Sequence, residues 1–285
     1  MQSIENYDSI AKIKLGTEFD GFFEGSEKRI LIKLNDFNTS NLDYDLLKKL
    51  LDSVNCKILG HIKNDHYNMY LLSESTLMTF GNIIILKTCG NTTPLEFVKA
   101  LQNEISVEII DFEYSHPYFI KQDLQPFPHK YLVDESKYLS NFSNKKISVC
   151  HNDYLNYFYT NKVFDKIEIL LWEFTWTNKF IELLKDNIKN WVIDEFYFKP
   201  QGYSMNAIHN DKYMTVHVTP NKNCSYLSIE TNLYIINIKN IIEVLIPKKF
   251  CIFSNNNEGG ANLFKIDKYD PKLFINNGIV IESFS

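Results

Sequence analysis

The sequence has no long apolar run and no basic stripe. No hydrophobic segment approaches the roughly 20 residues that a helix needs to cross a bilayer. The N-terminal segment MQSIENYDSIAKIKLG lacks the basic-then-apolar order of a signal peptide. The net charge is -5, with acids and bases scattered along the chain, so no phosphate-binding surface is indicated. We therefore expect a cytoplasmic protein that binds neither membranes nor nucleic acids.

Several common site signatures are also missing. There is no G-x-S-x-G, Walker loop, G-x-G-x-x-G or H-E-x-x-H. The five cysteines are odd in number and show no C-x-x-C spacing, which argues against a disulfide framework and against a zinc site. We expect no metal and a reducing compartment. The cysteines are Cys56, Cys89, Cys150, Cys224 and Cys251.

What is present fits a globular protein with strands and helices in alternation. The chain has 285 residues, 45% of them hydrophobic, enough for a sizeable core. Apolar spacing predicts the elements in turn. The expected strands are 30–34, 69–74, 82–90, 111–116, 213–220, 225–235 and an edge strand at 276–284, and the expected helices are 43–54, 92–105, 167–184 and 238–247. Thr93, Pro94 and Glu96 are typical of a helix start with a capping box.

The predicted order of elements repeats once along the chain. Tyr70 and Tyr213 have the same separation as Thr88 and Thr231, about half of the chain. No Gly/Ser/Pro-rich linker divides the halves. We therefore expect one domain, 1–285, with two pseudo-equivalent halves.

Strand alternation sorts the candidate chemical groups by face. His217 shares a face with Thr215 and Thr219, and Cys89 shares one with Lys87 and Ile85. A lone strand histidine is more often structural than catalytic, and a single cysteine is usually a small buried hydrophobe.

Three short polar residues interrupt the apolar run YLLSESTLMTF at residues 73–75. Ser204 follows a glycine in GYSMN, where an ordinary turn is the simpler interpretation. Glu24 and Glu27 flank Gly25 in FFEGSEKR, where two acids could be merely solvated.

Taken together, these segments resemble a known family. FFEGSEK, YLLSES, LKTCG, FKPQGYSMN, VHVTP and SIETN follow one another in the order and spacing of the eukaryotic-type S-adenosylmethionine decarboxylases, pyruvoyl enzymes of polyamine synthesis. The resemblance runs from about residue 22 to the C-terminus, and VIDEFYFKPQGYSMN is its most specific part. It implies an α+β fold, a four-layer α-β-β-α sandwich of two mostly antiparallel sheets, with the active site between the sheets.

The resemblance also implies self-cleavage between Glu74 and Ser75, giving chains 1–74 and 75–285. The Ser75 hydroxyl can attack the Glu74 carbonyl carbon through a five-membered ring, which needs local strain and oxyanion donors. Removal of the Ser75 α-proton then expels the Glu74 carboxylate, and the resulting dehydroalanine tautomerises and hydrolyses to a pyruvoyl group at the new N-terminus. In the family pattern Ser204 and His217 assist this maturation, and the pyruvoyl carbonyl takes the substrate amine as a Schiff base.

Further site residues follow from the same resemblance. Cys89 resembles the proton donor to the substrate carbon, and Phe23 and Phe198 resemble the aromatics that sandwich adenine. Glu24 and Glu27 match the active-site acids, which suit a cationic sulfonium substrate. The new carboxyl end at Glu74 would stay in the pocket.

Some positions depart from the family pattern. Asn221 stands where a glutamate usually holds the ribose hydroxyls, so we expect weaker substrate binding with the chemistry retained. Lys87, Glu168 and Glu230 match a buried diamine site, but Leu31 replaces an acid, Glu113 replaces an aromatic and Asp165 is displaced by one position. Putrescine is therefore a candidate effector whose effect the sequence does not decide, and a homodimer is a candidate assembly.

One alternative stays open. A prozyme-like, non-cleaving paralogue would activate a partner decarboxylase. The presence of Glu74, Ser75, Cys89, Ser204 and His217 favours the active enzyme. The ordered motifs argue against an unrelated α/β binding protein.

Overall fold

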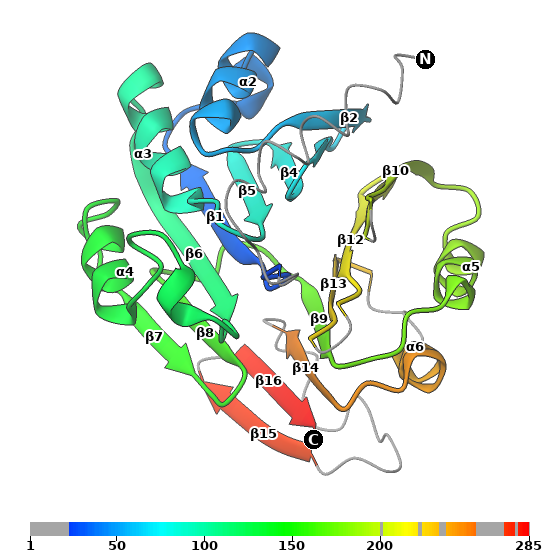
Figure 1. The fold of residues 1–285 in the computed structure, drawn as a ribbon. Coiled ribbons are helices and arrows are strands. Elements are labelled where there is room, and N and C mark those ends of the chain that lie inside the picture. Colours follow the sequence, from blue (N-terminus) through cyan, green and yellow to red (C-terminus); the bar gives the residue numbers. More distant parts are fainter. Residues whose placement is uncertain are drawn as a thin grey trace.

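Two antiparallel eight-stranded sheets pack face to face, with helices on both outer sides (Figure 1). The computed structural model describes residues 23–199, 202–221, 224–233, 238–254, 271–276 and 279–284. The first sheet contains, in spatial order, β2 (Ile58–Lys63), β3 (Asn68–Leu72), β4 (Ser75–Phe80), β5 (Ile83–Thr88), β1 (Lys28–Leu34), β6 (Ile109–Pro117), β8 (Leu155–Tyr159) and β7 (Ser148–His151). The second contains β10 (Val192–Tyr197), β11 (Tyr203–His209), β12 (Lys212–Thr219), β13 (Tyr226–Thr231), β9 (Ile167–Trp172), β14 (Lys249–Ser254), β16 (Ile279–Phe284) and β15 (Pro271–Asn276).

The two sheets repeat the same strand order, which confirms the predicted fold class and duplication. Each strand of the first sheet has its counterpart eight strands later in the chain. Thr88 and Thr231 end the equivalent strands β5 and β13. Tyr70 and Tyr213 lie in β3 and β12, which are not equivalent, so that pair was a coincidence of spacing.

Helices cover the outer face of each sheet. The helices α2 (Tyr44–Ser53), α3 (Pro94–Ile105) and α4 (Leu132–Leu139) lie over the first sheet, and α5 (Asn178–Asn187) and α6 (Ile238–Leu245) lie over the second (Figure 1). Two short 3-10 turns, at Thr39–Asn41 and Gln122–Leu124, complete the described elements. Asp43 caps α2 by accepting from the Leu46 amide at 2.7 Å.

Three sequence predictions need correction. Residues 167–184 do not form one helix: β9 takes the apolar run and α5 starts only at Asn178, because a fully buried strand and a buried helix share the same apolar signal. The segment 276–284 is not an edge strand, since β16 lies between β14 and β15. Pro94 does open α3, but the Thr93 side chain makes no capping hydrogen bond.

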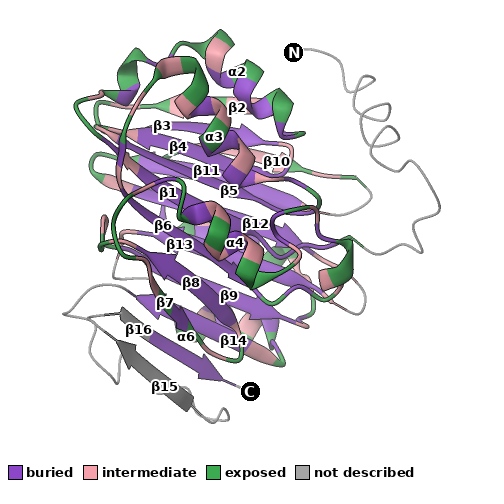
Figure 2. Cartoon of the chain, turned by 90° about the vertical axis from the view of Figure 1, so that its left-hand side faces the viewer, coloured by how far each residue is buried: buried purple, intermediate pink, exposed green. Residues whose placement is uncertain are grey.

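The apolar clusters define the layers. One cluster joins α2 and α3 to the first sheet, and a second joins α5 and α6 to the other sheet. Two further clusters, one around Met69 and Ile208 and one around Tyr157 and Trp172, join the sheets to each other. Figure 2 shows the central strands mostly buried and the helices exposed on their outer faces, while β2, β7 and β10 at the sheet edges are only partly buried.

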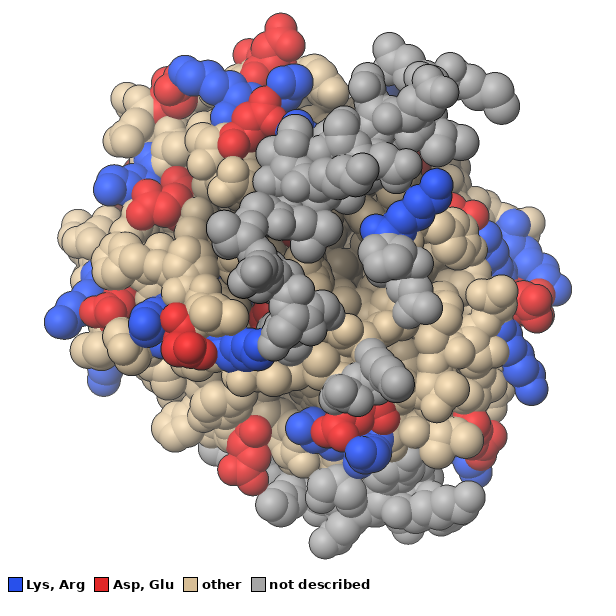
Figure 3. Space-filling view, viewed as in Figure 1, with Lys and Arg blue, Asp and Glu red and all other residues tan. Residues whose placement is uncertain are grey.

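The surface charge is mixed. On the face shown in Figure 3, basic and acidic side chains are interspersed around the rim. None of the helices in the described segments is long and apolar enough to span a bilayer.

Candidate active site between the sheets

The polar interruption in YLLSESTLMTF is the turn of the β3–β4 hairpin. Leu72 and Ser75 are paired across the hairpin, so Ser73 and Glu74 form a two-residue loop. The Ser73 amide donates to the Lys57 carbonyl at 2.8 Å, and the Ser73 hydroxyl accepts from the Lys57 amide at 3.0 Å. Glu74 and Ser75 are both buried. The expected cleavage bond therefore lies in a tethered turn inside the molecule.

Ser75 has a strained backbone. Its φ is 150°, a region that is essentially restricted to glycine, whereas the other positive-φ side-chain-bearing residues described lie between 45° and 61°. Leu77, two residues on, packs on the helix side of the sheet. Simple alternation would send Ser75 to that side too, yet its hydroxyl donates to Glu27, which lies between the sheets. The unusual φ thus accompanies a hydroxyl turned toward the site.

Cys89 contacts the residue before the expected cleavage bond twice. Its backbone amide donates to the Glu74 carbonyl oxygen at 3.1 Å, and its sulfur lies 3.6 Å from Glu74 Oε2. The side chain is buried. Ile85, on the same strand face, packs between the sheets, which confirms the predicted orientation of this face.

Glu27 connects the two sheets at this point. Its carboxylate accepts the hydroxyls of Ser75 from the first sheet and Ser228 from the second. Lys87 Nζ lies 3.4 Å from the same carboxylate. Glu27 is therefore a buried, charge-balanced acceptor next to the Ser75 hydroxyl.

His217 lies on β12, opposite Ser204 on β11 and Ser228 on β13. Its Nδ1 is 3.0 Å from the Ser204 hydroxyl, and its Nε2 is 3.3 Å from the Thr219 hydroxyl. Burial lowers the pKa of His217 below its usual value, Glu27 opposing this shift and Lys87 adding to it. The imidazole is thus neutral at pH 7. Among the described residues no hydrogen bond joins Ser75 to His217 or Ser204; Glu27 binds the Ser75 hydroxyl and acts on His217 through its charge.

The segment before β1 supplies Phe23 and Glu24. Both Glu24 carboxylate oxygens accept backbone amides, from Ser26 at 3.3 Å, Ile120 at 2.8 Å and Lys121 at 3.4 Å. Phe23 is 41% exposed, and its carbonyl accepts from the Asn221 side chain at 3.1 Å. Asn221 therefore holds the backbone at the entrance of the site.

The two predicted adenine-binding rings are on different elements. A Cβ atom added to Gly90, where φ is +61°, would lie 3.1 Å from the Phe23 ring and 3.6 Å from Glu74 Oε2, so Phe23 sits beside the cleavage turn. Phe198 packs edge-on against Phe196, with ring centroids 4.9 Å apart. An intervening base would keep Phe23 and Phe198 out of direct contact, so their roles in binding stay predictions.

A buried charged cluster extends from Glu27 between the sheets. Lys87 Nζ lies 3.2 Å from Glu168 and 3.5 Å from Glu230. Burial alone would lower the pKa of Lys87, but these carboxylates and Glu27 raise it above its usual value, so the ammonium stays charged. All four predicted members, Lys87, Glu113, Glu168 and Glu230, belong to this cluster.

Sequence reasoning missed two cations of the cluster. Arg29 binds Glu230 through Nε at 2.7 Å and lies 3.6 Å from Glu113, and Lys166 binds Glu168 at 2.8 Å. A charged residue at an inward position of an otherwise apolar strand was the available signal for Arg29. Two positions that depart from the family's diamine site lie outside the charged cluster. Leu31 packs in an apolar cluster, and Asp165 pairs with Lys162 at 2.7 Å.

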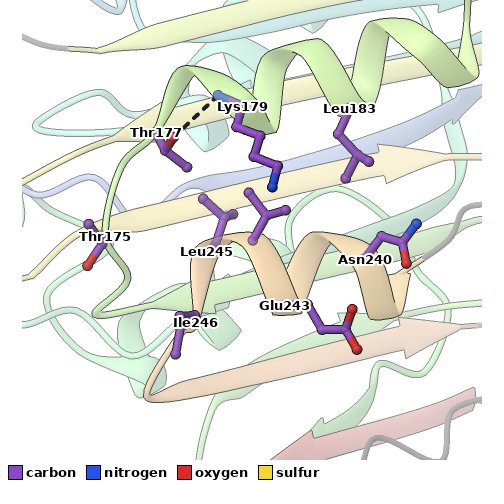
Figure 4. A pocket seen from close by; sticks show the side chains of 9 residues that line it. Thr175, Thr177, Lys179, Leu183, Asn240, Glu243, Leu245 and Ile246 are labelled. Atoms are coloured by element: carbon purple, nitrogen blue, oxygen red, sulfur yellow. Dashed lines mark hydrogen bonds between the residues drawn. The ribbon is translucent and has the colours of Figure 1, made fainter.

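One sizeable groove lies away from the candidate site. A groove of about 600 Å³ lies between α5 and α6, lined by Thr177, Leu183 and Glu243 among others (Figure 4). None of the candidate site residues lines it. A smaller cavity of about 310 Å³ includes Ile120 and Cys224, and the Ile120 amide binds Glu24. No cluster of metal-binding side chains occurs within the described segments.

The fold and the site together define the class of protein. The protein is a four-layer α-β-β-α sandwich whose candidate site lies between two antiparallel sheets, at a strained serine. The chain belongs to the adenosylmethionine decarboxylase family, whose model matches residues 20–170 and 152–273.

Curated relatives agree with this assignment. The chain is similar to S-adenosylmethionine decarboxylase proenzymes of Drosophila melanogaster (33% identical, covering 82% of this chain and 83% of the relative), Xenopus laevis (30%, 80% and 82%) and Dictyostelium discoideum (26%, 93% and 74%). The fold is similar to the crystal structure of Trypanosoma brucei AdoMetDC-delta26 monomer, with a TM-score of 0.52, 19% identity, and coverage of 73% of this chain and 97% of that one.

Proposed function

We propose that this chain cleaves itself between Glu74 and Ser75 and that the product decarboxylates S-adenosylmethionine, supplying an aminopropyl donor for polyamine synthesis. The observation that carries the proposal is Ser75 itself. Its φ of 150° strains the backbone at the expected bond, and its hydroxyl is held by the buried Glu27 carboxylate. The relatives are S-adenosylmethionine decarboxylase proenzymes, which fits a maturation step.

The contacts suit the first step of cleavage. As the Ser75 oxygen attacks the Glu74 carbonyl carbon, its proton passes to Glu27 and negative charge develops on the carbonyl oxygen. The Cys89 amide already donates to that oxygen at 3.1 Å and would stabilise the charge. The Glu74–Ser75 C–N bond then breaks as Glu27 returns this proton to the Ser75 nitrogen, giving an ester between the same residues and a free amine on Ser75.

The second step needs a base. The neutral His217 suits removal of the Ser75 α-proton, and Ser204 fixes its ring through Nδ1. Because no direct contact joins His217 to Ser75 here, the ester rearrangement would have to bring the α-carbon toward the imidazole. Elimination releases the Glu74 carboxylate and leaves a dehydroalanine, whose imine tautomer is hydrolysed by water to the pyruvoyl group with release of ammonia.

These residues fit a pyruvoyl group at position 75, because the position is buried, strained and next to a potential proton donor. Such a group would supply an electron-accepting carbonyl for decarboxylation. Cys89 would deliver a proton to the substrate carbon, since a thiol is protonated near neutrality yet can give its proton up. Phe23 and Phe198 would stack on adenine, and Asn221 would meet the ribose. Glu24, with both oxygens bonded, contributes a fixed negative charge that favours the cationic substrate.

Four accompanying assignments are proposals of the same kind. The single domain 1–285 would mature into chains 1–74 and 75–285. Putrescine as an effector would act at the charged cluster of Lys87, Glu113, Glu168 and Glu230. A homodimer and a cytoplasmic location follow from the family resemblance.

Mass spectrometry of the purified chain tests the proposal. We expect two polypeptides, 1–74 and 75–285, the larger with a blocked N-terminus, together with carbon dioxide release from S-adenosylmethionine. Ser75→Ala should abolish both. A folded, full-length chain that lacks activity alone but stimulates a partner decarboxylase would instead establish the non-cleaving paralogue. Activity that survives Ser75→Ala would overturn the mechanism.

A further inference from the structure

Lys28, the first residue of β1, is a buried cation without a carboxylate partner. Its side chain is fully buried, and Nζ donates to the Gly90 carbonyl at 2.7 Å and to Gln125 Oε1 at 2.8 Å. The ammonium also lies 5.1 Å from the centroid of the Phe119 ring. Within the described segments no carboxylate reaches ion-pair distance of it. Both hydrogen-bond acceptors are neutral, although burying an ammonium without an opposite charge is costly.

Among the titratable groups near Lys28, Cys89 has the strongest electrostatic interaction with the ammonium. Burial lowers the pKa of Lys28 to about 8, and the strongest opposing influence is Cys89, followed by Glu24, Glu135 and Cys56. His129, a neighbour of Glu135, is disfavoured as a cation by Lys28. Phe119, under the ammonium, stacks on His116, which binds Glu135 at 2.9 Å. These titratable groups come from the residues before β1, the strand ends around the site, and α4.

Four hydrogen bonds hold the turn that carries Cys89. The Cys89 amide donates to Glu74, the Gly90 amide donates to the Glu24 carbonyl at 3.0 Å, and Thr92 Oγ1 donates to the Cys89 carbonyl at 2.8 Å. Lys28 supplies the remaining tie, to the Gly90 carbonyl. It is the cation among the groups that hold this turn, and it faces a thiol whose other charged neighbour is the Glu74 carboxylate, 3.6 Å from the sulfur.

We propose that Lys28 is a positioning residue for Cys89: it fixes the Cys89–Gly90 turn and supplies the positive charge that stabilises the Cys89 thiolate. The proposal rests on the proposed function, because the thiolate forms when Cys89 gives its proton to the substrate carbon. There the S–H bond breaks, a C–H bond forms on the substrate, and sulfur keeps the electron pair. A proton from water later restores the thiol. Protonation of the wrong carbon would transaminate the pyruvoyl group and inactivate the enzyme.

The thiol itself gives a readout that is independent of turnover. In the purified protein, the alkylation rate of Cys89 by iodoacetamide is followed against pH by mass spectrometry of its peptide. In Lys28→Met we expect the midpoint to move upward by about one pH unit, because the facing charge is lost. Lys28→Arg keeps the charge and should stay near the wild-type midpoint. Gln125→Met is the matched control, because it removes one hydrogen bond of Lys28 and leaves the ammonium.

The second readout follows the reaction. Lys28→Met should inactivate by transamination after fewer turnovers than wild type, and the pH profile of kcat should move with the thiol midpoint. If Lys28→Met does not fold, Lys28→Gln, neutral but polar, carries the same comparison.

Two outcomes would overturn the proposal. An unchanged midpoint in the neutral variants removes the electrostatic role, and equal shifts in Lys28→Met and Gln125→Met reduce Lys28 to packing. An unprocessed, inactive wild-type chain would instead refute the proposed function, while the comparison of thiol midpoints would still report on Lys28.

Discussion

Ser75 combines a backbone angle and a side-chain contact that act on the same bond. The φ of 150° raises the energy of the resting peptide, and the bond to Glu27 holds the hydroxyl on the inner side of the sheet. Their coincidence at the turn between β3 and β4 explains why cleavage is expected there.

Glu27→Gln tests the base assigned to the first step. The amide keeps the shape and can still bond Ser75, but it cannot take the proton. Since a positioned base contributes roughly 10²–10⁴-fold, we expect processing to slow by at least about 10²-fold. The half-time for appearance of chain 75–285 on a gel measures this. Ser228→Ala, which removes the other hydroxyl bound to Glu27, is the control and should slow processing far less. Equal half-times for Glu27→Gln and wild type would exclude Glu27 as the base.

At the scale of elements, the sequence predicted which residues share a strand face. Alternation placed Cys89 with Ile85 and Lys87, and His217 with Thr215 and Thr219, and the apolar clusters confirm both faces. It could not predict the angle at Ser75, nor the reach of Lys28 to Gly90, because these depend on contacts between residues far apart in sequence. The helix predicted at 167–184 was wrong because a buried strand carries no alternation.

The turn after β5 gives an element-scale prediction. Gly90→Ala places a methyl group 3.1 Å from the Phe23 ring at a φ of +61°, so the ring must move away from the cleavage turn. We expect the KM for S-adenosylmethionine to rise several-fold while self-cleavage continues. Gly81→Ala is a matched control, because its φ is +53° but nothing lies within 4 Å of the added atom. Both variants carry about 1–2 kcal/mol of backbone strain. Similar KM values in the two would mean that Phe23 does not contact substrate.

The docking of α4 gives a pH-dependent prediction. Glu135 on α4 binds the ring nitrogens of His116 and His129, each at 2.9 Å, and the Tyr114 hydroxyl at 2.6 Å. Burial lowers the pKa of His129 to about 4, with Glu135 opposing the shift. Burial works to raise the pKa of Glu135, but the two histidines lower it to about 2.

The lowered pKa values of His129 and Glu135 both make the folded state less stable as the pH falls. A depressed histidine pKa contributes stability that is present above its unfolded value of about 6.5 and is lost as pH falls toward 4. The Glu135 contribution is present above about 4.5 and is lost toward pH 2. We therefore expect the free energy of unfolding in urea to fall below pH 6.5, by up to about 1.4 kcal/mol per pH unit from His129. His129→Gln should flatten this slope, and His66→Gln, at an exposed site, should leave it unchanged. A slope that persists in His129→Gln would assign it to other groups.

For the molecule as a whole, the buried charges tie the two sheets together. Arg29 and Lys87 on the first sheet bind Glu230 and Glu168 on the second. Such pairs form only once both halves are packed, which is why the sequence pattern did not point to Arg29 as the partner of Glu230. The duplicated halves thus meet in apolar clusters around Met69 and Tyr157 with a charged layer between them.

That charged layer predicts a weak response to diamines. Glu27, Glu113, Glu168 and Glu230 face Arg29, Lys87 and Lys166, so the cations of the chain already offset most of the acidic charge. Adding a dication would bury excess positive charge, which is costly. We expect putrescine to change the decarboxylation rate of the wild type by less than about twofold, because one unpaired charge at most remains for it.

Lys166→Met removes the ammonium 2.8 Å from Glu168 and leaves that acid to Lys87 alone, so this variant should lose activity and regain part of it with putrescine. Lys162→Met, which breaks a surface pair with Asp165, is the matched control and should show neither effect. Strong stimulation of the wild type, or no rescue of a folded Lys166→Met variant, would show that the cluster does not set the diamine response.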